Sequence, residues 1–261
     1  MQTHRLPITS TSALNPGVAK REVFAWAMYD FANSGYTTVV LTAVFNAYFV
    51  SVIANGAAWA TFAWTATLAV SYIGVMIFGP VIGAYADAHG AKKRILFGVT
   101  TGCVAATAGL FFAREGSIAI AVVLVIISNF CYAIGENITA AFLPELSTPE
   151  AMGKVSGWGW SLGYVGGLVA LGVCLAWIMT AESRGMKTSD AVPMTNLITA
   201  VLYLLGASVT FVWLKERAVA QRDVATSSAW SRLIATAKEA GHYRDLQAMF
   251  VCGALYQAGV V

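Results

Sequence analysis

The sequence has few charged residues for its length. Only 11% of its 261 residues are charged, whereas an average soluble domain carries roughly 25%. The formal net charge of +3 does not indicate a nucleic-acid partner, because the Lys and Arg residues cluster in alternate loops between apolar segments. A soluble domain and a nucleic-acid-binding protein are therefore both excluded.

Patterns typical of enzymes and metal sites are also missing. The cysteines have neither disulfide nor metal-ligand spacing, and we interpret them as small buried hydrophobic residues: Cys103, Cys131, Cys174 and Cys252. The histidines lie at the terminus or in loops, without clustered acids or thiols: His4, His89 and His242. No Ser/His/Asp arrangement is visible, so we expect no enzymatic activity, no cofactor and no metal. The N-terminus lacks the apolar run of a signal peptide.

Long apolar segments dominate the chain. Hydrophobic residues make up 58% of it and the mean hydropathy is +0.68. A segment of eighteen or more apolar residues can cross a hydrocarbon core about 30 Å thick. The expected spans are Phe24–Ile53, Trp59–Ala86, Ile95–Ala113, Ser117–Leu143, Val155–Thr180 and Pro193–Leu214, followed by Leu246–Val261.

These spans predict an all-α membrane protein with a six-helix bundle and the start of a seventh helix. The last segment reaches only about 24 Å at ~1.5 Å per residue, so we expect the chain to be cut within a helix. The expected parts are a cytoplasmic N-terminal segment, the bundle, a cytoplasmic linker and the incomplete seventh helix: 1–22, 23–214, 215–245 and 246–261.

Positive charge predicts the orientation. Of the 16 Lys and Arg residues, all but Arg114, Arg184 and Lys187 fall on one side of the expected spans, which places the N-terminus and the 215–245 linker in the cytoplasm. We therefore expect a multi-pass protein of the cell (inner) membrane. Within the linker, Trp230, Leu233, Ile234 and Ala237 share one helical face, which is typical of an amphipathic surface helix. A solvated linker is the alternative.

The loop between the second and third spans carries a recognisable motif. Asp87 is expected to end a helix and Gly90 to permit a turn before the cations. The motif residues are Gly83, Asp87, Gly90, Lys92, Lys93 and Arg94. This pattern resembles the signature loop of the major facilitator superfamily, although Ala88 and Ala91 stand where Arg is common. An ordinary basic cytoplasmic loop is the alternative.

Three further segments resemble the vacuole-effluxer branch of that superfamily, the relatives of the autophagy-related amino-acid exporter of fungal vacuoles. They are Trp26–Ser34, Ala141–Glu145 and Val155–Gly167. The resemblance implies a secondary transporter that moves a small solute by alternating access between two six-helix halves, with proton coupling and amino-acid efflux as the implied activity. The expected partners are the lipid bilayer, a small solute, protons and a missing C-terminal half.

Polar residues share one face in two expected spans. They are Asp30, Asn33, Ser34 and Thr37 in the first span, and Asn129, Tyr132, Glu136 and Asn137 in the fourth. Asp30 and Glu136 lie about 9 and 10 Å from the cytoplasmic ends of their spans, and a charged group in lipid is costly. The resemblance implies that both faces line the substrate or proton pathway. A structural hydrogen-bond layer between helices is the alternative.

Two further groups are candidates for packing and gating. Gly159, Gly163 and Gly167 recur at every fourth residue of the fifth span, which lets a neighbouring helix approach closely. Glu145 and Lys154 flank the fourth-to-fifth connection, and the resemblance implies that such acids pair with the basic signature loop as a cytoplasmic gate. Exposed pairs can also contribute nothing measurable.

Other functions remain as alternatives to a carrier of this kind. A non-transporting membrane scaffold or enzyme subunit would need a soluble catalytic module or a Ser/His/Asp or metal constellation, and none is visible in the sequence. A half-size carrier that works as a homodimer is disfavoured by the incomplete last helix. An inactive truncated carrier is the remaining possibility.

Overall fold

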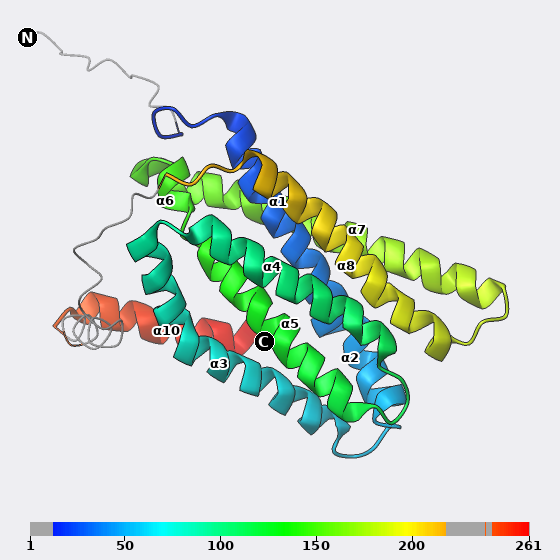
Figure 1. The fold of residues 1–261 in the computed structure, drawn as a ribbon. Coiled ribbons are helices and arrows are strands. Elements are labelled where there is room, and N and C mark those ends of the chain that lie inside the picture. The colour runs from blue at the N-terminus through cyan, green and yellow to red at the C-terminus, as the bar shows by residue number, and fades with distance from the viewer. Residues whose placement is uncertain (1–12, 218–237, 239–241, 261) are drawn as a thin grey trace, which may run out of the picture.

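The computed structural model describes residues 13–217, 238 and 242–260, and these are almost entirely helical (Figure 1). The first two spanning units contain α1 (Lys20–Tyr36), η1 (Thr37–Ala43), α2 (Phe45–Tyr48), η2 (Phe49–Ile53) and α3 (Ala60–His89). The next two contain α4 (Lys92–Gly109), η3 (Leu110–Phe112), α5 (Ile118–Ala140) and α6 (Leu143–Leu146). The remaining helices are η4 (Pro149–Ala151), α7 (Met152–Ser183), α8 (Thr188–Trp213) and α10 (Arg244–Val260).

Six helical units in the described part are long and apolar enough to cross a membrane. This confirms the expected all-α membrane fold. Several units extend beyond the apolar runs that predicted them, because the charged ends of a span continue the helix past the hydrocarbon region. α10 has 17 residues, and the expected amphipathic helix around Trp230 lies outside the described residues.

The turn between α3 and α4 corrects one expectation. Asp87 does not end its helix but lies inside α3, which continues to His89. Gly90 then adopts a left-handed conformation with φ 57° and its N–H bonds to the Ala86 carbonyl. Glycine takes this conformation without steric cost, so Gly90 alone makes the turn.

The first spanning unit is not a regular α-helix throughout. Its backbone widens into a π-helical turn at η1, which begins at Thr37, the last residue of the predicted polar face. Such turns are frequent at functional sites because they displace the side chains that follow. The apolar pattern predicted an unbroken helix here and did not reveal the change.

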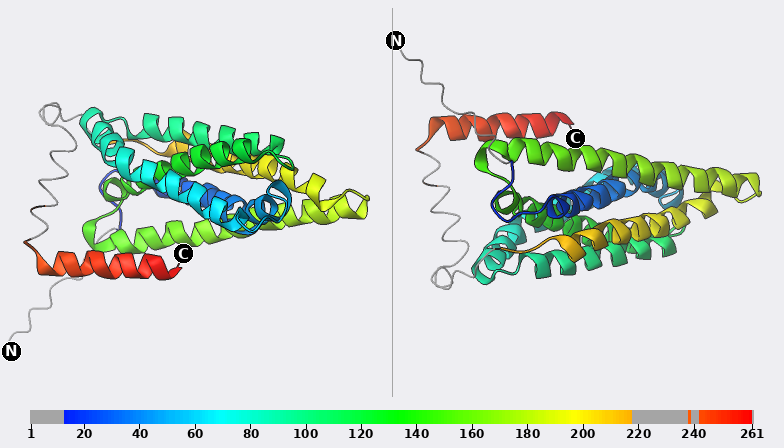
Figure 2. Two further views of the ribbon diagram at one scale, coloured as in Figure 1. Left: turned by 90° about the horizontal axis from the view of Figure 1, so that it is seen from below. Right: turned by 90° about the horizontal axis from the view of Figure 1, so that it is seen from above.

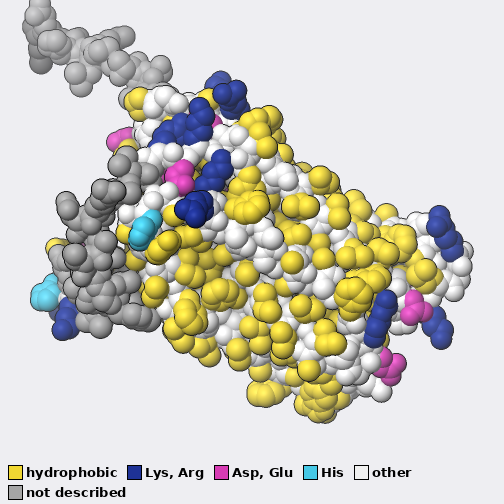
Figure 3. Space-filling view, in the orientation of Figure 1, with side chains coloured by type: hydrophobic (Ala, Val, Ile, Leu, Met, Phe, Trp, Pro, Cys, Tyr) yellow, Lys and Arg dark blue, Asp and Glu magenta, His cyan; other side chains and the backbone are white. Residues whose placement is uncertain are grey.

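The bundle is arranged around α1, which packs against α7 and α8, while α4 lies against α5 and α8 and α3 lies against α5. In Figure 2 the helices diverge toward the end that carries the α3–α4 turn. Large apolar side chains cover the outside of the bundle, among them Phe62 and Met76, which are 77% and 74% exposed. Figure 3 shows this apolar middle zone between two ends that carry the Lys and Arg residues, as expected for a surface that faces lipid.

Polar side chains inside the bundle bond to one another across helices. The Trp26 indole N–H donates to the Thr139 carbonyl over 2.8 Å, and the hydroxyls of Tyr36 and Ser128 lie 2.8 Å apart. Because lipid offers no hydrogen-bond partners, such groups must be satisfied within the protein. These contacts join α1 to α5 and set the depth at which the polar face of α1 lies.

Candidate functional site

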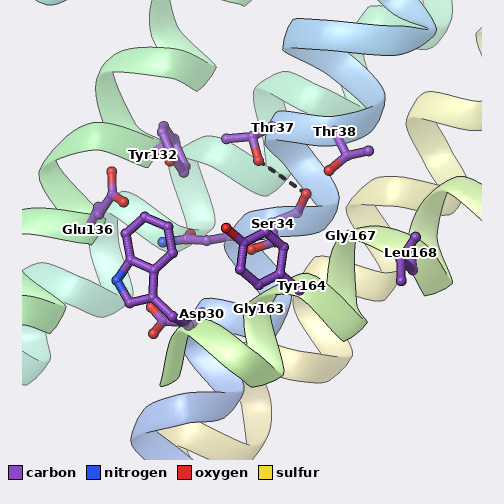
Figure 4. Close-up of a pocket in the computed structure, with 12 residues that line it drawn as sticks. Asp30, Ser34, Thr37, Thr38, Tyr132, Glu136, Gly163, Tyr164, Gly167 and Leu168 are labelled. Carbon is purple, nitrogen blue, oxygen red and sulfur yellow. Dashed lines mark hydrogen bonds between the residues drawn. The ribbon is translucent and has the colours of Figure 1, made fainter. Parts of the chain in front are cut away.

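The polar face of α1 opens on a cavity of about 370 Å³ between α1, α5 and α7 (Figure 4). Its described lining consists of Asp30, Asn33, Ser34, Thr37, Thr38, Tyr132, Glu136, Trp160, Gly163, Tyr164, Gly167 and Leu168. Six of the eight residues predicted for a substrate or proton pathway are therefore brought together: Asp30, Asn33, Ser34, Thr37, Tyr132 and Glu136.

Two carboxylates share this cavity. Asp30 comes from α1 and is partly buried, whereas Glu136 comes from α5 and is exposed, and the two interact electrostatically. No Lys or Arg lines the cavity in the part of the chain that the structure describes. A charged group at this depth is costly in lipid, so the cavity gives both acids a polar environment.

The asparagines of the two polar faces have different surroundings. Asn33 is 5% exposed; its Oδ1 accepts a hydrogen bond from the Tyr203 hydroxyl of α8, and its Nδ2 has no partner among the described residues. Asn129 lies away from the cavity, fully buried, and donates to Ser71 on α3 over 3.1 Å. Asn137 lines a separate small cavity of about 80 Å³ between α3 and α5.

Glycines of α7 bring that helix against α1. A Cβ at Gly163 would lie 2.8 Å from the Ser34 hydroxyl, and one at Gly167 would lie 2.8 Å from the Thr38 hydroxyl. Gly159 faces Trp26 and Asp30 in the same way. Side chains at these positions would fill the space that the α1 residues occupy, so the small-residue stripe sets the distance between the two helices.

The close contact also places two aromatic rings in the cavity that the sequence analysis did not predict. Trp160 and Tyr164 are 65% and 69% exposed, and their ring centroids lie 6.2 Å apart. Each follows a stripe glycine by one residue, which puts it on the adjacent face of the helix. Their spacing relative to that stripe is the signal that could have identified them.

Lys92 is the centre of the ion pairs at the α3–α4 turn. Its Nζ lies 3.0 Å from Glu145 Oε1 and 3.4 Å from Asp87 Oδ1, and only 10% of its side chain is exposed. Lys154 belongs to a different environment, since its Nζ lies 5.8 Å from the centre of the Trp158 ring. Arg94 is exposed and forms no salt bridge with a described residue.

The segment after α8 joins this network through residues that the sequence analysis missed. The Glu216 carboxylate accepts hydrogen bonds from the backbone N–H groups of Lys92 and Lys93, at 2.6 and 3.2 Å. The backbone N–H of Arg217 donates to Glu145 over 2.9 Å, and its guanidinium lies 2.7 Å from Glu22 Oε2. The chain after α8 thereby ties together the same ends of α1, α4, α6 and α8.

Comparisons with known proteins agree with these features. The sequence model of the family described as vacuole effluxer Atg22 like matches residues 49–260. A protein of Bacillus subtilis (strain 168), described as the uncharacterized MFS-type transporter YxiO, is 28% identical over 242 residues, which is 90% of this chain and 56% of the relative. The chain therefore spans little more than half of the length of that relative. No solved structure matches the chain.

Proposed function

Since the chain belongs to the vacuole effluxer Atg22-like family, we propose that it forms the solute-binding N-terminal half of a secondary carrier that works by alternating access. The bundle of residues 23–214 is the half that moves as a unit, residues 215–245 are the linker and residues 246–261 begin the second half. This half and its counterpart rock around a site near the membrane midplane, where such carriers bind their solute.

One observation carries this proposal. The cavity between α1, α5 and α7 holds two carboxylates, three Ser and Thr hydroxyls of α1 and η1, and three aromatic rings, within a bundle whose outer surface is apolar. A charge in the membrane costs free energy, and ionisable residues within spans typically mark a substrate, ion or proton pathway. A scaffold protein does not account for this arrangement.

Within this proposal, Asp30 and Glu136 couple solute movement to protons. They lie at similar depth on neighbouring helices and line one cavity, so a proton taken up from one side can be released when the cavity opens to the other. Ser34 and Thr37 contribute hydroxyl groups that bind the solute. The family description names an effluxer, and within this proposal the exported solute is an amino acid, which carries both an amino group and a carboxylate.

The test uses amide substitutions in the longer carrier that contains this half. Asp30→Asn and Glu136→Gln keep side-chain shape and hydrogen bonding but cannot exchange a proton. We expect at least one of them to abolish proton-driven flux, while expression and solute exchange at equal pH remain. Asn129→Asp would not serve as a control, because the Asn129 side chain is fully buried. The matched control is Glu150→Gln, because Glu150 lies on the exposed connection between α6 and α7. Unchanged, pH-dependent flux in the double amide variant would contradict the coupling role.

The orientation belongs to the same proposal. The N-terminus, the α3–α4 turn and the segment after α8 lie on the cytoplasmic side of the cell membrane, because Lys and Arg residues concentrate there. The ion pairs of Lys92 with Glu145 and Asp87 then form a cytoplasmic gate that holds one conformation of the carrier. Opening the gate requires these pairs to separate, which couples the gate to movement of α4 against α3 and α6.

A further inference from the structure

A second hollow lies on the opposite side of the α1–α7 contact from the solute cavity. It is an apolar groove of about 700 Å³, and none of the residues that line it lines the solute cavity. Val23, Phe24 and Ala27 of α1 form one wall, and Trp158, Leu162 and Val165 of α7 form the other. Phe24, Trp158 and Val165 are each between 45% and 49% exposed, so the groove opens toward the membrane.

The groove is closed at one end by a short extended segment that is firmly attached. Leu14 pairs with Ser147 in an isolated β-bridge, and Leu14 also lines the groove. The next residue, Asn15, donates from its backbone to the Leu146 carbonyl over 3.1 Å and from its side chain to the Pro144 carbonyl over 2.9 Å. The groove is therefore a built feature with one fixed end, not an accidental gap between two helices.

Cations gather at that same end. Lys20, the first residue of α1, lines the groove and is exposed, and the neighbouring Arg21 is exposed as well. Lys154, near the start of α7, lies over the ring of Trp158, which is itself a groove residue. Neither Lys20 nor Lys154 forms a salt bridge with any residue in the described part of the chain, so their charges are available to a ligand.

The dimensions of the groove match one leaflet of a bilayer. Lys154 and Val165 are eleven residues apart on α7, a distance of roughly 16 Å along the helix, and half of a hydrocarbon core is about 15 Å. A ligand that fits must be charged negatively at the end near Lys20 and Lys154 and apolar for the remaining length. An acyl chain under an anionic headgroup has both properties.

We propose that the groove binds an anionic phospholipid from the leaflet on the Lys- and Arg-rich side of the protein. Lys20 and Lys154 pair with its phosphate, Trp158 lies at the level of its glycerol backbone, and one acyl chain packs between α1 and α7 beside Phe24 and Val165. Because the groove borders the α1–α7 contact, the bound lipid supports the two helices that also wall the solute cavity. This site depends on neither the solute nor proton coupling.

The test is native mass spectrometry of the purified 261-residue chain, released from detergent after incubation with phosphatidylglycerol or with phosphatidylcholine of the same acyl chains. We expect one phosphatidylglycerol to be retained in preference to phosphatidylcholine. A basic residue near the headgroups is worth about 1 kcal/mol, or roughly fivefold in affinity. Lys20→Gln and Lys154→Gln should each weaken phosphatidylglycerol retention by about that factor.

Two matched variants separate this site from general adhesion of lipid. Lys187→Gln removes an exposed cation at the other end of the bundle and should leave retention unchanged. Val165→Trp fills the groove and should displace the lipid, whereas Val201→Trp, at an exposed position of α8, should not. Equal retention of the two lipids, or retention insensitive to Val165→Trp, would overturn the proposal. Failure to retain any lipid at saturating concentration would also overturn it.

Discussion

The closest approach of α1 and α7 offers a prediction whose sign can be worked out from the structure. It occurs at Gly166, which does not belong to the fourth-residue glycine stripe that the sequence suggested. A Cβ at Gly166 would lie 2.7 Å from both Cα and the carbonyl carbon of Phe31, and nearer still to the Phe31 oxygen. These are backbone atoms of a neighbouring helix, so a side-chain rotation cannot relieve the overlap.

Gly166→Ala should therefore destabilise the bundle. Overpacking of this kind costs typically 1–3 kcal/mol, and the upper end applies because only a shift of a whole helix relieves it. Alanine gains about 1 kcal/mol over glycine within a helix, which leaves a net loss of roughly 2 kcal/mol. Gly172→Ala on the same helix is the matched control, since a Cβ there meets nothing within 4 Å, and it should gain up to about 1 kcal/mol.

Thermal unfolding followed with a thiol-reactive dye measures the difference. Cys103 and Cys174 are fully buried and become reactive when the bundle opens, while Cys252, which is exposed, is first replaced by Ser. The two variants should differ by about 3 kcal/mol, which corresponds to a difference in Tm of roughly 6–12 °C for a chain of this size. If Gly166→Ala melts at or above the temperature of Gly172→Ala, the helices are not in the contact described.

Three further outcomes are expected. Glu145→Gln should lower the free energy of unfolding by about 2 kcal/mol, because the hydrogen bond from the largely buried Lys92 ammonium then goes to a neutral group. Equal dye-melting curves for this variant and for Glu150→Gln would contradict this expectation. Gly153→Cys and Ser183→Cys, at exposed positions near the two ends of α7, should be labelled by an impermeant reagent from opposite sides of the membrane, Gly153→Cys from the cytoplasm. Labelling of both variants from one side would show that α7 does not span the membrane. The purified 261-residue chain should not transport solute in liposomes, because α1, α5 and α7 supply the described lining of only one half of the solute site. Saturable solute uptake by this chain alone would refute the proposal that the site is shared between two halves of the carrier.

The spans themselves could be predicted from the sequence because each is a local property of an apolar run. The helices at the membrane surface were harder to delimit, since charged residues continue a helix beyond the hydrocarbon region, as Asp87 does within α3. The π-helical turn at η1 was not predictable, because its mainly β-branched Thr and Val residues also occur in ordinary helical spans. η1 packs against α7 and α8, and these contacts are not visible in its local sequence.

The polar face of α1 could also be predicted, because helical periodicity alone places Asp30, Ser34 and Thr37 on one side. The same argument fails for α5. Asn129 and Glu136 are seven residues apart and share a face, yet Asn129 bonds to Ser71 on α3 while Glu136 lines the cavity. Periodicity tells which side chains point in one direction, but not where a neighbouring helix covers that direction.

The amino-acid sequence by itself thus determined the membrane class, the number of complete spans and the polar stripe that faces the cavity, all of which follow from local composition and helical spacing. Only the tertiary structure decided which distant residues meet: Lys92 with Glu145, Glu22 with Arg217, and the aromatic rings of α7 beside the acids of α1 and α5. The physical reason is that helix–helix contact in a membrane depends on close packing of small residues and on pairs of polar groups. Both depend on the positions of two helices at once, and no single stretch of sequence contains them.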